Sequence, residues 1–366
     1  MMNMTDLLQL TVASEASDLH LQAGNHPALR IAGELVFQTQ LPKLTAQDTR
    51  KLFESIATEE QRRILARELE LDFAYSADDI GRFRVNAHFQ MGTLAMVFRV
   101  VRTVIPTIEE LGLPTICKTL VMKPHGMVVI TGPTGSGKST TLAAMLDYLN
   151  EHAKCKVITI EDPIEYVHQD KGCVFCQREL GTDTKSFPAA LKHALRQDPD
   201  VIMVGEMRDL ETIATALTAA ETGHLVLTTL HTPGTVQAMD RIIDVFPPHQ
   251  QQQVRLQLAT TLQGVLYQNL VPRLNGQGVV AAVEVLVATV AVRSIIREGK
   301  THQMMNSIQT GAEYGMQTLD EALVRLCRAG IIAKEEAMLR ARSPEEMERL
   351  FQNPRSARNG VLAGER

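Results

Sequence analysis

The sequence predicts an α/β protein with two domains, a small α+β domain followed by a larger domain built on a parallel sheet. Residues 1–103 contain short strand-like segments around a charged, helix-forming stretch. In the later part of the chain, apolar runs alternate with amphipathic helical stretches, which is typical of a parallel sheet covered by helices. The segment 104–118 between the two patterns contains Pro106, Gly112 and Pro114 and is predicted to be an interdomain linker.

The composition is that of an ordinary globular protein. The 366 residues are enough for two or three domains, with 45% hydrophobic and 22% charged residues. The formal net charge of -5 gives no overall attraction to nucleic acid. Residues 1–9 lack a basic stretch followed by a long apolar core, and no apolar run has the length of a membrane span. We therefore expect a cytoplasmic protein whose membrane association depends on a partner.

The five cysteines are scattered along the chain, which argues against a disulfide framework. Cys173 and Cys176 form a C-x-x-C pair with His168 just upstream. A structural zinc site needs four ligands, and no second cysteine pair completes the set. We therefore expect ordinary, partly buried cysteines here in preference to a metal site.

The first domain is predicted to form an antiparallel sheet. Its strand-like segments lie at 16–21, 28–31, 82–87 and 95–100, and its helix-forming stretch at 45–70. Arg82, Arg84 and Arg99 recur along the last two strand-like segments. Charge on a strand usually marks a solvated face, and the spacing by itself assigns these arginines no other role.

The motif that organises the second domain follows an apolar run at 127–130. It consists of Gly132, Pro133, Thr134, Gly135, Ser136, Gly137, Lys138, Ser139 and Thr140 and fits G-x-x-x-x-G-K-[ST], the phosphate-binding P-loop. An amphipathic helix pattern begins directly after it. A strand, a glycine loop and a helix N-terminus together form a cradle of backbone amides for phosphate oxygens. We predict that Lys138 reaches the β- and γ-phosphates of a nucleoside triphosphate and that the Ser139 hydroxyl holds Mg²⁺.

The second domain is predicted to span residues 119–352. Its apolar runs lie at 127–130, 157–160, 201–204 and 225–227. Beyond residue 235 the chain is predicted to be mostly helical, with one helix opened by the capping box Thr318-x-x-Glu321. Residues 353–366 are rich in Arg, Gly and Asn and are predicted to form a disordered tail.

Acidic side chains and a histidine follow successive apolar runs. Glu161, Asp162 and Glu165 follow the second run, Glu206 the third, and His231 the fourth. Ligands of open α/β sheets sit at the carboxyl ends of the strands, and nucleotide hydrolysis needs acids near the metal and the attacking water. Singly, each residue is equally typical of a helix cap or a satisfied polar side chain. Their order behind a P-loop favours a catalytic site, with Glu206 suited to orient water.

Together these motifs resemble the ATPases of type II and type IV secretion and of type IV pili. The matching elements are 132–140 (Walker A), 161–165 (Asp box), 205–209 (Walker B) and 222–232 (His box), within a similarity that runs from Ala16 to about Leu326. Residues 291–298, Ala-Val-Arg-Ser-Ile-Ile-Arg-Glu, are close to the Ala-Ile-Arg-Asn-Leu-Ile-Arg-Glu motif of pilus retraction ATPases, with Val292, Ser294 and Ile295 as departures.

Assembly-type members of this superfamily carry a long extra N-terminal domain and a tetra-cysteine zinc site, and this sequence shows neither. We therefore expect a hexameric ATPase that drives pilus retraction and twitching motility. An accessory retraction ATPase, or a pilus-assembly or type II secretion ATPase, is the alternative. A nucleic-acid motor is disfavoured because the chain has no basic, aromatic-rich stretch.

The resemblance implies a PAS-like first domain, a RecA-like second domain and a homohexameric ring. Such a ring would act on an inner-membrane pilus platform protein from the cytoplasmic face. In the family, nucleotide lies between the two domains, so Arg84 and Arg99, in preference to Arg82, would approach the phosphates and neutralise transition-state charge. The family commonly has an arginine where this sequence has Met91.

The resemblance also implies roles for the candidate residues after the strands. Glu206 would orient or deprotonate the attacking water, and His231 would sense the γ-phosphate of ATP. Glu161, Asp162 and Glu165 would shape the Mg²⁺ shell.

The segment 291–298 has two distinct faces at helical spacing. Val292, Ile295 and Ile296 form an apolar face, while Arg293 and Arg297 lie four residues apart on another. Because the segment is far along the chain from the phosphate-binding elements, we expect the arginine pair to serve a protein contact or the transmission of domain rotation.

Overall fold

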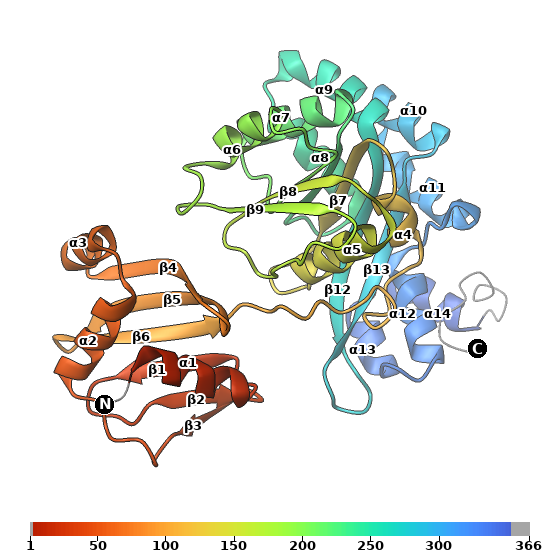
Figure 1. Ribbon diagram of the computed structural model, residues 1–366. Coiled ribbons are helices and arrows are strands. Elements are labelled where there is room, and N and C mark those ends of the chain that lie inside the picture. Colours follow the sequence, from red (N-terminus) through yellow and green to blue (C-terminus); the bar gives the residue numbers. More distant parts are fainter. Residues whose placement is uncertain (1–2, 353–366) are drawn as a thin grey trace. The chain divides into compact units, whose positions relative to one another are not determined.

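The computed structural model describes residues 3–352, which divide into two compact units (Figure 1). Unit 1 is the chain up to Val104 together with Glu165–Val167, and unit 2 is Ile105–Ile164 together with the chain from His168 onward. The short segment belongs to unit 1 because Tyr166 forms a parallel bridge with Arg102, whose Nη1 donates to the Tyr166 hydroxyl at 3.3 Å. The predicted tail at 353–366 lies outside the described residues.

Unit 1 is built on an antiparallel sheet, as the sequence predicts, and the sheet has six strands. Its elements are α1 (Met4–Ala13), β1 (Asp18–Gln22), β2 (Ala28–Ile31), β3 (Glu34–Phe37), α2 (Ala46–Ile56), α3 (Glu59–Glu68), β4 (Glu70–Ala77), β5 (Gly81–Gln90) and β6 (Thr93–Val100). The strand order is β3-β2-β1-β6-β5-β4, and every neighbouring pair is antiparallel. The sequence patterns do not identify α1, β3 or β4.

The two faces of this sheet differ because side chains alternate along its strands. Phe83 of β5 and Phe98 of β6 are fully buried, while Arg84 and Arg99 point the other way and are exposed. These two arginines are direct register partners across the antiparallel pair. Arg99 Nε donates to Asp18 Oδ1 at 2.8 Å. The arginine-bearing face is therefore the polar face of the sheet.

Unit 2 is built on a seven-stranded sheet in the order β13-β12-β7-β11-β10-β8-β9. Its strands are β7 (Gly126–Thr131), β8 (Lys156–Glu161), β9 (Val174–Glu179), β10 (Val201–Val204), β11 (Leu225–Leu230), β12 (Leu262–Pro272) and β13 (Val279–Val287). All pairings except β12–β13 are parallel. The four strands predicted from the apolar runs are present, and their parallel arrangement is confirmed.

The helices of unit 2 lie between and beyond these strands. They are α4 (Ile116–Val121), α5 (Lys138–His152), α6 (Phe187–Ala194), α7 (Leu210–Glu221), α8 (Thr235–Asp244), α9 (Pro248–Thr261), α10 (Val290–Glu298), α11 (Met304–Thr310), α12 (Leu319–Arg328), α13 (Lys334–Leu339) and α14 (Pro344–Gln352). Short 3-10 turns occupy Thr301–Gln303 and Ala312–Tyr314. Among the described residues no helix is long and apolar enough to cross a bilayer.

The expectation that the chain is mostly helical beyond residue 235 is wrong for 262–287. These residues form the antiparallel β12–β13 hairpin, which extends the sheet next to β7. The run Val279–Val287 is almost continuously apolar and is buried on both faces. It therefore shows no alternation, and its alanines favour helix as readily as strand.

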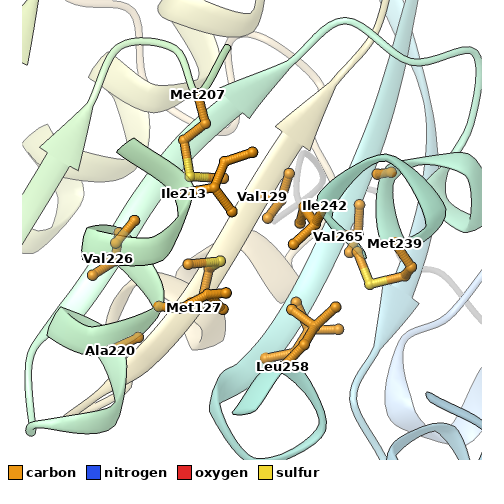
Figure 2. Close-up of a cluster of buried hydrophobic side chains, with 14 of the residues drawn as sticks. Met127, Val129, Met207, Ile213, Ala220, Val226, Met239, Ile242, Leu258 and Val265 are labelled. Carbon is orange, nitrogen blue, oxygen red and sulfur yellow. The ribbon is translucent and has the colours of Figure 1, made fainter. Parts of the chain in front are cut away.

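The sheet of unit 2 separates two hydrophobic clusters. Met127 and Val129 of β7 face one cluster, while Val128 and Ile130 face the other, and all four are fully buried. Helices α6 to α11 cover the first face, and α4 and α5 cover the second. Figure 2 shows side chains of the first cluster, among them Val129 of β7, Ile213 of α7 and Ile242 of α8. Burying each such side chain stabilises the fold by about 1.5–3 kcal/mol, which fixes the strand ends that carry the site.

In the segment 104–118, predicted to be a linker, the residues from Ile105 onward belong to unit 2. Ile108, Leu113 and Cys117 are buried in the cluster that also contains α5. Their apolar side chains explain why this stretch belongs to unit 2 although its prolines and glycine are typical of a connector.

The C-terminal helices α12 to α14 pack on the β12–β13 hairpin (Figure 1). The predicted capping box at the start of α12 is confirmed, because Thr318 Oγ1 accepts from Glu321 N at 3.2 Å and Glu321 Oε2 accepts from Thr318 N at 2.8 Å.

Candidate nucleotide-binding site

The P-loop lies between β7 and α5, as the sequence predicts. Gly132 has φ 149°, and a Cβ at this position would lie 2.4 Å from the carbonyl oxygen of Gln268. Gly137 has φ 85°, and a Cβ there would lie 2.8 Å from Gln268 Nε2. Both glycines have left-handed backbone and lie against β12, so a larger residue at Gly132 would displace the strand backbone and one at Gly137 would displace the side chain of Gln268.

The side chain of Lys138 reaches back to the first residues of the P-loop. Its ammonium donates to the carbonyl oxygens of Gly132 and Pro133, each at 3.0 Å, and only 8% of the residue is exposed. The Ser136 Oγ atom is buried and has no hydrogen-bond partner among the described residues. Ser139 and Thr140 lie half-buried in the first turn of α5, where helix amides favour an anion. This donor set fits a phosphate group.

A buried glutamine of β12 braces the loop and was not identified from the sequence. Gln268 Nε2 donates to the carbonyl oxygen of Ser136 at 2.7 Å, and its Oε1 accepts from Thr141 Oγ1 at 2.7 Å. The residue is 2% exposed. A polar residue inside the apolar run of β12 is the signal that identifies it, once that run is recognised as a buried strand.

We expect Gln268→Leu to weaken nucleotide binding by roughly tenfold. The substitution leaves two buried polar groups, Ser136 O and Thr141 Oγ1, without their partner, at a cost of about 1–3 kcal/mol each. Equilibrium binding of a fluorescent ADP analogue measures the change. Gln263→Leu is the matched control, because Gln263 lies on the same strand but donates to His125 O. Equal affinity of the two variants would show that Gln268 does not shape the loop.

Glu206 lies just beyond β10, in the segment predicted as Walker B. Its Oε1 accepts from Arg208 Nε at 2.8 Å and lies 3.3 Å from His231 Nε2. Burial raises the pKa of this carboxyl, but the hydrogen bonds from Arg208 and His231 and the charge of Arg208 outweigh it, so the net pKa is lowered. Glu206 is therefore ionised at neutral pH, as a base that orients water must be.

The pH dependence of hydrolysis follows from this lowered pKa. A base acts when it is deprotonated, so we expect the Glu206-dependent acid limb of kcat to lie below 4.5, the ordinary value for this group. Arg208→Gln removes the hydrogen bond and the charge that lower the pKa, and should move the limb upward. Profiles of kcat from about pH 3 to 8, with folding checked by circular dichroism at each pH, measure both. Identical acid limbs in the two proteins would contradict this electrostatic account.

His231 joins Glu206 to Lys138. Its Nδ1 lies 3.5 Å from Lys138 Nζ, and its Nε2 lies 3.3 Å from Glu206 Oε1. The tautomer with hydrogen on Nε2 satisfies both contacts, because Nδ1 then accepts from the ammonium and Nε2 donates to the carboxylate. Three residues predicted from separate motifs are thus brought together at neighbouring strand ends.

The acids of the Asp box take different positions. Glu161 ends β8, is 8% exposed, and accepts from Thr159 Oγ1 at 2.6 Å and from Gln177 Nε2 at 3.2 Å. Asp162 is exposed directly after it. Glu165 is exposed and belongs to unit 1, as do Arg84 and Arg99, so their roles at the nucleotide stay predictions.

Cys173 of the C-x-x-C pair and His168 contact a thiol and an aromatic ring. Cys173 Sγ lies 3.3 Å from Cys155 Sγ, and the His168 ring stacks on Phe175 at 4.5 Å between centroids. Burial lowers the pKa of His168 to about 4. Within residues 3–352 no three His, Cys, Asp or Glu side chains are grouped so as to hold a metal ion.

The segment 291–298 forms α10, and its two arginines differ. Val292 and Ile296 are buried and Ile295 packs against the same cluster, so the predicted anchoring face is confirmed. Arg293 Nη1 donates to the carbonyl oxygens of Ala259 and Thr260 at 2.7 and 2.8 Å, and Arg293 Nε donates to Ala288 O at 3.1 Å; Arg297 is exposed. The two arginines, which we expected to serve a protein contact or the transmission of domain rotation as a pair, therefore differ: Arg293 caps the C-terminus of α9, and of the two only Arg297 is exposed for such a contact.

The family model for Type II/IV secretion system proteins matches residues 3–313. The chain belongs to this family. It is 48% identical over 344 residues to the type IV pilus retraction ATPase PilT of Pseudomonas aeruginosa, covering 94% of this chain and 99% of that protein. It is also 48% identical over 321 residues to a twitching motility protein of Neisseria gonorrhoeae, covering 88% and 86% of the two chains.

A solved structure of the pilus retraction motor PilT with bound ADP has the same fold. It aligns with a TM-score of 0.89 and 45% sequence identity, covering 95% of this chain and 100% of that one. The resemblance to secretion ATPases, and within them to retraction ATPases, is thus confirmed over nearly the whole chain.

Proposed function

We propose that the protein is a P-loop ATPase that powers type IV pilus retraction. The observation that carries the proposal is the contact of His231 with both Lys138 and Glu206 behind a complete P-loop. That arrangement links a phosphate-binding cation to an ionised carboxylate through one imidazole. The 48% identity to a retraction ATPase supports the choice of motor.

The residues of unit 2 divide the chemistry between them. The amides of 132–140 and the ammonium of Lys138 bind and orient the β- and γ-phosphates of ATP. Glu206 accepts the proton of the attacking water. His231, which contacts both Glu206 and Lys138, senses whether the γ-phosphate is present. Transition-state charge is stabilised mainly by such preorganised donors.

Ser139 is the residue of the P-loop that would hold Mg²⁺, with Glu161 and Asp162 near its outer shell. Mg²⁺ binds few protein ligands and takes its remaining ligands from phosphate oxygens and water, so a single hydroxyl at the start of α5 fits it. When bound, the ion neutralises charge on the β- and γ-phosphate oxygens.

The two exposed arginines of unit 1 are proposed to act on nucleotide as well. Arg84 and Arg99 are direct cross-strand partners, and like charges in that position destabilise a sheet. Asp18 offsets part of that repulsion through Arg99. An anion placed against both guanidinium groups would offset the rest, which supports the role that the resemblance implies.

The architecture of the motor is proposed from the same relatives. Unit 1 would be a PAS-like domain, unit 2 a RecA-like domain, and six copies would form a ring at the cytoplasmic face of the inner membrane. The ring would act on a platform protein of the pilus. At each nucleotide site, Glu165 would help to shape the shell of the Mg²⁺ ion.

An ATPase assay and a complementation assay test the proposal together. The purified chain should hydrolyse ATP without nucleic acid, and light scattering should give the mass of a hexamer. Expressed in a twitching bacterium that lacks its retraction ATPase, the chain should restore pilus retraction. ATPase activity without restored retraction would favour a pilus-assembly or secretion motor.

A further inference from the structure

A fully buried carboxylate lies on β13, away from the residues assigned above. Glu284 is 0% exposed. Its Oε1 accepts from Thr235 N at 3.0 Å, from Thr235 Oγ1 at 2.6 Å and from Arg342 Nη2 at 3.0 Å. A charge without water is retained only where donors and a countercharge compensate for it. The three donors converge on one oxygen, so this contact joins three separate segments of unit 2.

Arg342 lies between α13 and α14 and is fixed from several sides. Its Nη2 also donates to Pro233 O at 3.1 Å, and its guanidinium lies 5.5 Å from the centre of the Tyr267 ring. Its backbone N donates to Asp320 Oδ1 at 2.8 Å. The side chain therefore connects the C-terminal helices to the loop before α8.

That loop begins at His231. Residues 232–234 join His231 to Thr235, the first residue of α8. At the near end, Thr232 N donates to Thr131 Oγ1 at 2.9 Å, on the last residue of β7 before the P-loop. At the far end, Pro233 O and Thr235 contact Arg342 and Glu284. The backbone that carries His231 is thus held at two points, one of them formed by Glu284 of β13 and by Arg342 between α13 and α14.

We propose that Arg342 and Glu284 are positioning residues for His231. By holding the loop 232–235, the pair sets where the imidazole lies relative to Lys138 and Glu206. Through Arg342, the position of α13 and α14 is coupled to hydrolysis. The inference rests on the role proposed for His231 in ATP hydrolysis.

Gly234 supplies a test that changes neither charged residue. Its φ is 177°, an extended backbone that any residue adopts, so alanine causes no backbone strain there. A Cβ at this position would lie 2.1 Å from Arg342 Nη2 and 2.4 Å from Gln237 Oε1. Both are ends of flexible side chains. Gly234→Ala should therefore displace Arg342 from the loop while the protein still folds.

We expect Gly234→Ala and Arg342→Leu each to lower kcat for ATP by about tenfold or more, with KM changed by less than about twofold. The phosphate cradle is braced separately by Gln268, so binding should persist. Arg342→Lys keeps a cation beside Glu284 and should recover part of the activity. Arg340→Ala is the matched control and should leave kcat unchanged, since Arg340, directly after α13, pairs with Glu336 of that helix.

A double-mutant cycle identifies the residue through which the pair acts. In a His231→Ala background, adding Gly234→Ala should lower kcat no further, because the group being positioned is gone. Additive losses would overturn the proposal, as would unchanged kcat in Gly234→Ala. If Arg342→Leu does not fold, the kcat of Gly234→Ala alone tests the proposal. If His231→Ala itself keeps wild-type kcat, the role proposed for His231 fails first, and the positioning role falls with it.

Discussion

Replacing Glu206 with glutamine is expected to lower ATP hydrolysis by about 10²–10⁴-fold while ATP still binds. Glutamine keeps the shape of the side chain, and its amide oxygen can still accept from Arg208 and His231. It removes the charge that accepts a proton from water. The phosphates are bound instead by the loop 132–140, which this substitution does not touch.

Single-turnover kinetics and equilibrium binding of a fluorescent nucleotide measure the two effects separately. Arg208→Gln is the matched control, because it removes the partner of Glu206 but leaves the carboxylate. Its kcat near neutral pH should fall far less. Normal turnover in Glu206→Gln would mean that another acid is the base, and Glu161 or Glu165 would have to be tested next.

The site was largely predictable because its parts are local in sequence. The P-loop motif consists of eight consecutive residues, 132–139. Glu206 and His231 each follow an apolar run that ends at the same edge of a parallel sheet. Once the strands are recognised, their carboxyl ends must converge. The contact of His231 with Lys138 and Glu206 follows from that topology.

The residues that support the site were not predictable in this way. Gln268 and Glu284 lie on the β12–β13 hairpin, whose strands are buried on both faces and show no alternation. Their partners, Ser136 and Thr235, lie 132 and 49 residues away in sequence. No local pattern connects such pairs, because only the register of the hairpin against β7 brings them into contact.

Alanine substitutions at the two arginines of α10 are expected to have different effects. Arg293 donates to three carbonyl oxygens, two of them at the C-terminus of α9. Arg293→Ala removes these bonds and leaves the carbonyls of a helix end without their cation, so we expect a loss of about 1–3 kcal/mol in the free energy of unfolding. Thermal and urea unfolding measure this loss, and unchanged stability would show that the bonds are not formed in solution.

Arg297→Ala is expected to abolish pilus retraction without loss of ATPase activity. Arg297 is exposed on the helix whose opposite face, through Val292 and Ile296, is fixed in the core. Its removal therefore leaves the fold and the nucleotide site intact and changes only what the helix presents to another surface. ATP binding, ring assembly and basal hydrolysis should stay within about twofold of wild type, a change of under 0.5 kcal/mol.

The control is Lys300→Ala, which removes a neighbouring exposed cation that pairs with Glu298. It should retain both hydrolysis and retraction in a strain that lacks its own retraction ATPase. Loss of retraction in both variants would indicate that the charge of this surface matters in general, whatever residue carries it. Loss of hydrolysis together with retraction in Arg297→Ala would show that α10 supports the active site or the ring, because a helix face used only for contact cannot change the chemistry at Glu206.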